Sequence, residues 1–300
     1  MEKKSNFLSL QLDVSDFLPA NKEEKQGLVI MRESVSFWRD GLRRFRENKI
    51  AMTSFVIILV VLAFAFIGPG LYPYSYEQQI RGSENLAPME YSEEELALMS
   101  AGESVFPHIL GTDSLGRDTM VRLMMGSRIS LLVGIVASAL VLLIGSIYGT
   151  VSGYFGGRVD LIMMRIVDVI YTVPDILIII LLMVTLKFPL EALARNVPGF
   201  EWINTIGVGL ICIFIVFSLL YWVGMARIVR SQILTLKEQE YVTAARALGA
   251  SSGMIIRKHL LTNVMGTLIV TTTLQIPSAI FTESFLSFIG IGVAAPMPSL

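Results

Sequence analysis

Two aspartates and two histidines are the side chains of this sequence whose types and spacing first suggest chemistry. Asp168 and Asp175 are seven residues apart and would share one face of a helix. Carboxylates that act as acid and base are normally drawn from elements set opposite each other across a substrate. His108 and His259 are about 150 residues apart, and two histidines are too few for a histidine-rich metal site. A membrane-embedded enzyme, such as an intramembrane protease, is therefore disfavoured.

The cysteine and glycine patterns exclude two further kinds of site. The single cysteine, Cys212, lies in the apolar run 206–221, so one chain can form neither a disulfide framework nor a cysteine zinc cluster. The phosphate loop G-x-x-x-x-G-K-[ST] does not occur in the sequence. Gly145, Gly149 and Gly153 instead recur every four residues, which predicts a small-residue face for close helix packing. We predict no catalytic, cofactor-binding or metal-binding residue in this chain.

The composition places the chain in a membrane. Of its 300 residues, 53% are hydrophobic and only 16% are charged, and the mean hydropathy is +0.64. These values lie well outside the composition of an ordinary soluble domain. The net charge of −1 leaves no global basic excess that would attract nucleic acid.

Five apolar stretches approach the ~20 residues that a helix needs to cross the ~30 Å hydrocarbon layer. The third stretch contains Asp175 and is the least regular. We therefore predict an all-α integral membrane protein with spans at about 50–67, 129–154, 167–186, 202–226 and 264–282.

The placement of lysine and arginine predicts the orientation of these spans. Residues 30–49, 156–168 and 227–263 hold six, two and six basic residues, whereas 68–128 and 187–201 hold four and two. Because basic segments favour the cytoplasmic side, we predict a cytoplasmic N-terminus and an external segment 68–128. Five spans then leave the last residues outside, so we expect a sixth, returning helix beyond residue 300.

Two segments outside the spans carry helical patterns. Residues 1–49 are predicted to form a cytoplasmic tail, whose part at about 35–48 separates apolar residues from arginines, as in a helix lying at the lipid headgroups. In the external segment, Ser92 and Glu95 predict a capping box and a short helix over 93–99. The many glutamates nearby are interpreted as a solvated loop, with docking of a partner or attraction of cationic substrates as alternatives.

Asp175 is the one acidic residue well inside a predicted span. It lies eight residues into the third span, where a carboxylate that faced lipid would cost about 2.5–3.5 kcal/mol. We therefore expect it to face protein or water, after a kink at Pro174. A place on a substrate path, local capping and an ion pair remain open for it. Glu283, near the external end of the fifth span, is similarly ambiguous.

The predicted cytoplasmic segment 227–263 is more than a linker between two spans, because the pattern of residues 237–263 predicts a helix, a glycine turn and a second helix. Gly249 suits a left-handed helix cap, and Ser251 or Ser252 can cap the second helix. Small residues at the centre of the first helix's apolar stripe would let another backbone approach closely, which favours docking onto a second protein over a membrane-surface helix. The stripe follows the i, i+3, i+4, i+7 spacing at Tyr241, Ala244, Ala245 and Leu248.

Three separated motifs resemble those of one family. Glu240-Tyr-Val-Thr-Ala-Ala-Arg-Ala-Leu-Gly249 resembles the cytoplasmic EAA loop of binding-protein-dependent ABC importer permeases. Gly111-Thr-Asp-Ser-Leu-Gly-Arg-Asp118 and Thr282-Glu-Ser-Phe-Leu-Ser-Phe-Ile-Gly-Ile-Gly292 are similar to segments of its oligopeptide, dipeptide and nickel branch. The resemblance covers about residues 35–300. The sequence departs from the family at Thr243, where EAA has glutamate, and at Leu261-Thr262, where the family has Leu-Pro.

The resemblance implies a fold, a set of partners and a division of labour. The fold would be the type I ABC importer transmembrane domain, with residues 50–300 forming a permease in a bacterial or archaeal cell membrane. Its partners would be membrane lipid, a second homologous permease subunit, an extracytoplasmic substrate-binding protein and one or two ATP-binding subunits, which hold ATP and Mg²⁺. The chain itself would then be no enzyme. The residues implied to contact the ATPase are Glu240, Tyr241, Ala244, Ala245, Arg246, Leu248 and Gly249.

The resemblance also implies a cargo and a mechanism. We expect import of oligopeptides or dipeptides, with nickel as the alternative in the same family. A channel or secondary transporter without an ATPase is the third hypothesis, which the docking loop disfavours. ATP-driven closure of the partner subunits would move helix 239–249. The attached fourth and fifth spans would then rotate, so that the pathway opens alternately to the two sides of the membrane. Asp175 is the candidate residue on this pathway.

Overall fold

A computed structural model of the chain describes residues 37–293 with Met297 and Pro298, and for Phe37 and Trp38 it describes only the backbone. The predicted tail up to residue 36 lies outside this part. Every regular element within the described residues is a helix, apart from one isolated bridge between Thr112 and Asp118, which confirms the all-α prediction. The chain divides into two compact units, residues 1–59 and 60–300.

The first unit contains α2 (Phe37–Glu47) and most of α3 (Lys49–Phe66). Asn48 separates the two helices, and its side-chain oxygen accepts hydrogen bonds from the backbone N–H groups of Ile50 and Ala51 at 3.1 and 3.2 Å. Phe45 also meets Phe55 edge to face, with ring centroids 5.7 Å apart. The helix predicted at about 35–48 thus corresponds to α2, and its position at lipid headgroups stays a prediction.

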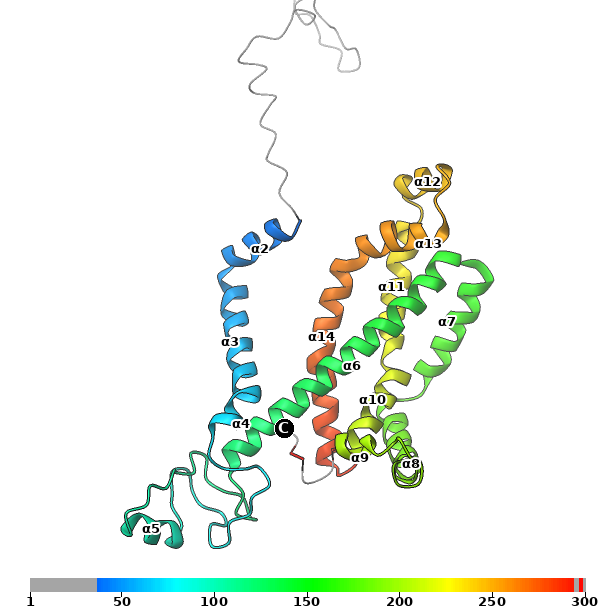
Figure 1. Cartoon of the computed structure of the whole chain (residues 1–300). Helices are drawn as coiled ribbons and strands as arrows, with labels where there is room; N and C mark the ends of the chain where they lie inside the picture. Colours follow the sequence, from blue (N-terminus) through cyan, green and yellow to red (C-terminus); the bar gives the residue numbers. More distant parts are fainter. Residues whose placement is uncertain (1–36, 294–296, 299–300) are drawn as a thin grey trace, which may run out of the picture. The chain divides into compact units, whose positions relative to one another are not determined.

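The second unit is built around one long helix, α6 (Figure 1). Helices α11 and α14 both pack along α6, and α7 returns beside them after the turn at Gly156. The helices of this unit in chain order are α4 (Gly68–Leu71), α5 (Glu93–Ser100), α6 (Thr119–Phe155), α7 (Gly157–Thr172), α8 (Asp175–Asn196), α9 (Trp202–Ile206), α10 (Val208–Leu220), α11 (Trp222–Leu236), α12 (Glu240–Ala247), α13 (Ser252–Met254), the π-helix η2 (Ile255–Leu260) and α14 (Leu261–Phe288).

The repeated glycines of α6 bring its backbone against α11. A Cβ added at Gly149 would lie 2.4 Å from the carbonyl oxygen of Ala226, and one added at Gly145 would lie 2.6 Å from the Cβ of Met225. Carbon atoms do not approach this closely, so any side chain would force the two helices apart. Gly153 makes the same kind of approach to Arg230 and Ile233. The predicted small-residue packing face is therefore confirmed.

Five helices of the described chain are long and apolar enough to cross a membrane, by length and composition. The third predicted span, 167–186, does not form one helix, because α7 ends at Thr172 and α8 begins at Asp175. The break falls at Pro174, which cannot donate a helical hydrogen bond and disfavours helix at the residue before it. The candidate spans are Lys49–Phe66, Thr119–Phe155, Asp175–Asn196, Val208–Leu236 and Ser252–Phe288.

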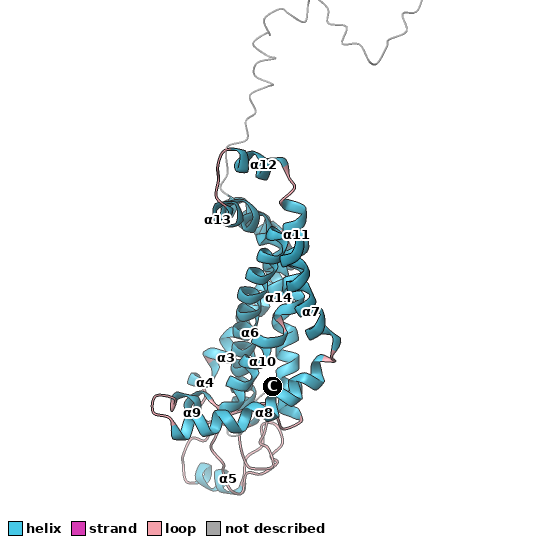
Figure 2. Ribbon diagram, turned by 90° about the vertical axis from the view of Figure 1, so that its right-hand side faces the viewer, coloured by secondary structure: helices cyan, strands magenta, loops and turns pink. Residues whose placement is uncertain are grey.

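The two ends of the second unit carry different segments. Helix α12 and the turn between α6 and α7 lie at one end, whereas α5, α8 and α9 lie at the other (Figure 1). The basic residues assign segments 156–168 and 227–263 to one side of the membrane, and 68–128 and 187–201 to the other. These two pairs of segments thus lie at opposite ends of the second unit. Figure 1 looks nearly along α8, and Figure 2 shows that helix lying across the bundle. Its direction therefore differs from that of the other long helices.

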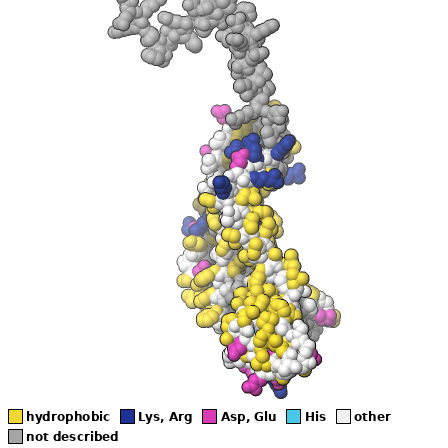
Figure 3. Space-filling model, turned by 90° about the vertical axis from the view of Figure 1, so that its left-hand side faces the viewer, with side chains coloured by type: hydrophobic (Ala, Val, Ile, Leu, Met, Phe, Trp, Pro, Cys, Tyr) yellow, Lys and Arg dark blue, Asp and Glu magenta, His cyan; other side chains and the backbone are white. Residues whose placement is uncertain are grey.

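Much of the surface is apolar. Large hydrophobic side chains are exposed along α3, α7, α8 and α14, including Leu161, Leu181 and Leu274, each more than 60% exposed. Hydrophobic side chains cover much of the face shown in Figure 3. An apolar surface of this extent needs lipid or other protein subunits to cover it.

Candidate functional site

Helix α12 projects from the end of α11 and is held by a glycine cap. The chain leaves α11 at Leu236, and α12 begins at Glu240. Gly249 ends this helix with a φ of +82°, and its N–H donates to the carbonyl of Arg246 at 3.0 Å. The N–H of Ala250 reaches back to the carbonyl of Ala245 at 3.1 Å. The left-handed cap predicted at Gly249 is therefore confirmed.

The second half of the loop differs from a simple helix. Ser251 caps α13 by accepting a hydrogen bond from the N–H of Met254 at 3.4 Å, as predicted for one of the two serines. The next six residues then form the π-helix η2 before α14 starts at Leu261. The wider turn buries both Ile255 and Leu260. The sequence pattern did not reveal this π-helix.

One side chain of α12 anchors the helix to the bundle. Val242 is fully buried in an apolar cluster with Ile233 of α11 and Ile255, Leu260 and Val264 of the following segment. Val242 was missed in the sequence because it lies off the apolar stripe. The feature of the sequence that could have indicated this anchor is a β-branched apolar residue on the otherwise polar side of the helix.

The predicted stripe faces away from this anchor. Leu248 is 90% exposed, Tyr241 is 39% exposed and Ala244 is exposed, while Ala245 is half-buried. Glu240, Arg246 and Gly249 are exposed as well. The structure thus brings all seven residues of the predicted ATPase contact into one short segment with an open surface.

Tyr241 also links α12 to the start of α14. The side-chain amide of Asn263 donates to the hydroxyl of Tyr241 at 3.2 Å and to the carbonyl of His259 at 2.6 Å. The rings of Tyr241 and His259 lie 6.3 Å apart, centroid to centroid. Movement of α12 would therefore reach both α11, through Val242, and α14, through Asn263.

Asp175 lies in a separate cleft toward the other end of the bundle. The cleft has a volume of about 480 Å³ and is bounded by the corner between α7 and α8, the junction of α10 and α11, and the middle of α14. Asp175 is exposed, and one of its carboxylate oxygens accepts the N–H of Ile176 at 2.9 Å. The polar side chains of the lining are Tyr171, Thr172, Asp175, Tyr221, Gln275 and Ser278. Asp175 therefore lines a cleft at the surface of the bundle, and the structure brings it nowhere near α12. The expectation that it faces protein or water stays a prediction.

Glu283 faces the protein interior. Its side chain is fully buried, and its two carboxylate oxygens accept hydrogen bonds from Ser130 of α6 at 2.7 Å and from Ser287 at 2.8 Å. Ser287 in turn accepts the N–H of Val293 at 3.1 Å. The motif around residues 282–292 therefore joins α14, α6 and the segment that follows α14.

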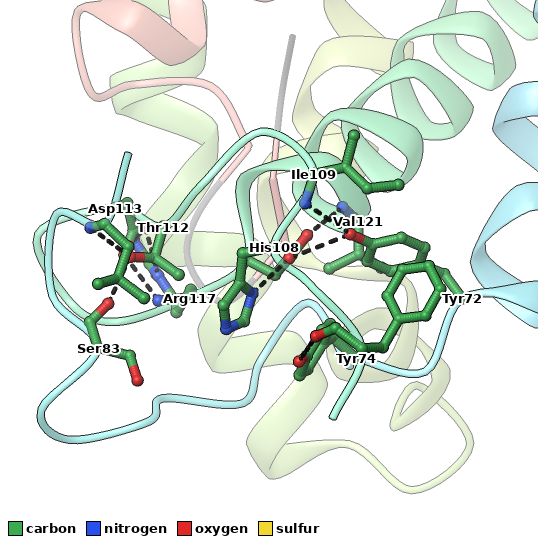
Figure 4. A network of polar contacts seen from close by, with 12 residues as sticks. Tyr72, Tyr74, Ser83, His108, Ile109, Thr112, Asp113, Arg117 and Val121 are labelled. Carbon is green, nitrogen blue, oxygen red and sulfur yellow. Dashed lines mark hydrogen bonds and ion pairs between the residues drawn. The ribbon is translucent and has the colours of Figure 1, made fainter. Parts of the chain in front are cut away.

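A buried histidine organises the segment before α6 (Figure 4). The Nδ1 of His108 lies 2.7 Å from Oδ2 of Asp118, and its Nε2 lies 3.1 Å from Oε1 of Glu95. Tyr74 stacks on the imidazole with a centroid distance of 4.3 Å. Burial, together with the nearby carboxylates of Glu95 and Asp118, raises the pKa of Tyr74 to about 12. Sequence reasoning placed no role on His108.

The motif at 111–118 folds into a tight turn that begins α6. Asp118 caps this helix by accepting the N–H of Val121 at 2.9 Å. Asp113 accepts the N–H groups of Leu115 and Arg117 at 2.9 and 3.0 Å and pairs with the Arg117 guanidinium at 2.7 Å. Burial raises the pKa of Asp113, but the hydrogen bonds and charge of Arg117 outweigh it and hold that pKa below its ordinary value of 3.8.

The predicted helix in the acidic segment is also present. Ser92 and Glu95 form both hydrogen bonds of a capping box, at 3.3 and 2.8 Å, and start α5. Glu95 therefore both caps α5 and contacts His108. No group of three or more His, Cys, Asp or Glu residues in the described part of the chain is arranged to hold a metal ion.

Comparison with known proteins gives two family matches and several close relatives. Residues 143–300 match the family described as binding-protein-dependent transport system inner membrane component, and residues 36–88 match the N-terminal transmembrane domain of oligopeptide transport permease C. The chain is 40% identical over 283 residues to the oligopeptide transport system permease protein OppC of Bacillus subtilis, covering 94% of this chain and 81% of the relative.

Two further relatives show the same pattern. The dipeptide transport system permease protein DppC of Bacillus subtilis is 42% identical over 283 residues, which is 94% of this chain and 77% of the relative. The oligopeptide transport system permease protein OppC of Escherichia coli K12 is 34% identical over 267 residues, which is 89% of this chain and 77% of the relative. The similarity thus extends over both units.

Proposed function

Because this chain belongs to the family of inner membrane components of binding-protein-dependent transport systems, we propose that it forms half of the translocation pathway of an ATP-driven importer of oligopeptides or dipeptides. The chain is an ABC importer permease and a multi-pass membrane protein, and ATP hydrolysis belongs to separate subunits of such transporters. The printed names of the relatives, which specify oligopeptide and dipeptide transport, support peptide as the cargo.

The surface of α12 supports the coupling role. Its exposed stripe has alanine at the centre and Tyr241 and Leu248 at the ends, so a partner could bring its own backbone close to Ala244. We assign this stripe to the ATP-binding subunit, which would bind ATP and Mg²⁺. Val242 and Asn263 would pass displacement of α12 to α11 and α14, because they connect α12 to both helices.

The cleft around Asp175 supports a place for this residue on the pathway. It combines one carboxylate with hydroxyl and amide groups, and no basic side chain is among the residues that line it. An ionisable group at membrane depth is retained where it faces water or a polar ligand. In the assembly, this cleft would lie toward the second, homologous permease subunit.

The remaining parts of the proposal concern orientation and partners. We place α12 in the cytoplasm of a bacterial or archaeal cell, because the end of the bundle with α12 also holds the more basic segments. We place the N-terminus there as well, because residues 30–49 hold six basic residues. The opposite end, with the acidic segment around α5, would receive peptide from an extracytoplasmic binding protein. Lipid would cover the outer apolar faces.

The proposed coupling role depends on the exposed stripe of α12 with Ala244 at its centre. Cysteine crosslinking tests whether this stripe contacts the ATP-binding subunit. In a Cys212→Ala background, Ala244→Cys should crosslink to the ATP-binding subunit in the complete assembly. Leu98→Cys, which is 44% exposed on α5 at the other end of the unit, is the control and should not crosslink to it. Failure of Ala244→Cys to trap any nucleotide hydrolase would overturn the coupling role. Uptake by the same assembly in vesicles, comparing peptides with nickel, decides the cargo.

A further inference from the structure

Helix α7 is fastened to α11 by a half-buried ion pair near the end of the bundle that carries α12. The guanidinium of Arg230 on α11 grips the Asp160 carboxylate with two nitrogens, Nε to Oδ1 and Nη2 to Oδ2, the second at 2.5 Å. The hydroxyl of Ser152 on α6 donates to the same carboxylate at 2.5 Å. Asp160 is thus held at once from α11 and α6, and its side chain is only 14% exposed.

A second ion pair joins the same two helices nearer the cleft. Nη2 of Arg227 lies 2.8 Å from Oδ1 of Asp168, and the guanidinium also covers the ring of Tyr171 at 4.3 Å from its centroid. Tyr171 lines the cleft that contains Asp175. Val167 of α7, next to Asp168, is buried in an apolar cluster with Trp222, Val223 and Ala226 of α11. The contact between the two helices therefore combines two ion pairs with one apolar patch.

The fastened helix α11 runs directly into the coupling segment. Lys237, the residue after α11, donates to the carbonyl of Gly153 at 2.9 Å, and the N–H of Gln239 returns to the carbonyl of Leu236 at 3.2 Å. Helix α12 begins at the next residue. A push on α12 would therefore act on the stretch of α11 that holds Arg230.

The other end of α7 forms the wall of the cleft. Residues 170–172 lie in the lining, and Pro174 and Asp175 follow at the corner with α8. Since a helix is stiff along its axis, displacement at Asp160 would reach this corner. We propose that Asp160 and Arg230 are positioning residues for transport: their ion pair makes α7 move with α11, so that displacement of α12 reshapes the cleft around Asp175.

This inference rests on the proposed coupling role of α12 and adds the route from that helix to the pathway. A guanidinium that binds a carboxylate through two nitrogens and two oxygens fixes the relative orientation of the two side chains as well as the distance between them. The Asp160 side chain is 14% exposed and that of Arg230 is 32% exposed, so the pair is partly shielded from water, which strengthens the attraction between its charges. A glutamate at position 160 would add one methylene group and alter this geometry. The ion pair with Arg230 therefore depends on the length of the Asp160 side chain.

Spin-label distances in the complete assembly test the route. Labels at Leu161→Cys on α7 and Ser231→Cys on α11, both exposed positions, report the distance between the helices in the Cys212→Ala background. In the otherwise unchanged protein this distance should be the same with and without ATP. With Asp160→Asn, the distance should become dependent on ATP, and peptide transported per ATP hydrolysed should fall about tenfold.

Charge exchange distinguishes a positioning role from a merely structural one. Asp160→Arg combined with Arg230→Asp should restore part of the coupling that either single change removes. Arg165→Gln, an exposed charge on α7 without an ion pair to a described residue, is the matched control and should leave both readouts unchanged. If Asp160→Asn prevents assembly, Asp168→Asn on the more exposed second pair gives the same comparison with a smaller expected effect.

The outcomes separate this inference from the function on which it rests. Absence of ATP-dependent peptide uptake by the unaltered assembly would overturn the proposed function. With uptake intact, an unchanged distance between α7 and α11 and unchanged coupling in both Asp160→Asn and Asp168→Asn would overturn the inference. An ATP-dependent distance in the unaltered protein would also overturn it, because the helices would then move separately.

Discussion

Asp118 lies 2.7 Å from the ring of His108 while its other carboxylate oxygen caps the first turn of α6. One side chain thus fixes both the start of the longest helix and the core of the segment before it. The capping bond and the imidazole contact use different oxygens, so both can form together. The motif at 111–118 is therefore a structural joint, since Asp113 accepts the N–H groups of Leu115 and Arg117 within the turn and Asp118 accepts the N–H of Val121 in α6.

Replacing Asp118 with alanine should destabilise this joint. The change removes a helix cap, which contributes about 0.5–2 kcal/mol, and leaves the buried His108 without one partner, which adds about 1–3 kcal/mol. Hydrogen exchange should show faster opening of residues 83–120 in detergent-solubilised protein. Glu103→Gln, an exposed position on the same side, is the control. Equal exchange in the two variants would contradict the role of Asp118.

Acid should weaken the same turn through Asp113. Its pKa is held below 3.8 in the folded protein, so the stabilisation from this carboxylate is present above the unfolded-state pKa near 3.8 and is lost as the pH falls through the lower, folded-state pKa. Hydrogen exchange of residues 111–118 should therefore accelerate as the pH is lowered below about 4, after correction for the intrinsic pH dependence of exchange. Asp113→Asn should remove this part of the acid sensitivity, and a variant with an unchanged profile would contradict it.

The parts of the structure that depend on neighbours in sequence were the parts that the sequence predicted. The Ser92–Glu95 capping box and the Gly249 cap involve residues within five positions of each other, and both are present. The glycine spacing of α6 was equally readable, because a helix places every fourth residue on nearly the same face.

Features that depend on distant residues were not predicted. His108 is buried by Tyr74, Glu95 and Asp118, which come from separate stretches of an irregular segment. The ion pair of Asp160 joins residues 70 positions apart, and no local pattern marks it. At Pro174, where the sequence predicts a kink within the third span, the backbone breaks fully between α7 and α8.

Adding one methyl group at Gly149 should separate α6 from α11. The new Cβ in Gly149→Ala would lie 2.4 Å from a backbone oxygen, which no rotamer change can relieve. We expect a loss of about 1–3 kcal/mol in the free energy of unfolding, read as a lower Tm in detergent. Gly266→Ala in α14 is the matched control, because a Cβ added at Gly266 would meet no atom within 4 Å. That variant should be neutral or slightly more stable, and an equal loss in both would argue against close packing at Gly149.

Two side chains of the coupling helix should separate anchoring from docking. Val242→Ala removes buried methyl groups and should loosen α12, at a cost of about 1–3 kcal/mol, with faster hydrogen exchange over residues 240–260. Leu248→Ala changes a side chain that is 90% exposed and should leave that exchange unchanged. It should instead weaken retention of the ATP-binding subunit during purification. Identical behaviour of the two variants would contradict the division between an inner anchor and an outer docking surface.

Substitution of Gly249 tests whether the shape of the cap, rather than the space around it, matters for coupling. A Cβ at this position would meet nothing within 4 Å, so any effect must come from the positive φ of +82°. Valine there should cost about 1–2 kcal/mol locally and tilt α12, because branched side chains resist the left-handed conformation. Asparagine, which adopts it more readily, is the control. We expect Gly249→Val to lower peptide uptake per ATP hydrolysed several-fold and Gly249→Asn to retain most of it. Since both variants add bulk at the same exposed point, equal uncoupling by valine and asparagine would assign the effect to steric interference with the partner and remove the argument from backbone conformation.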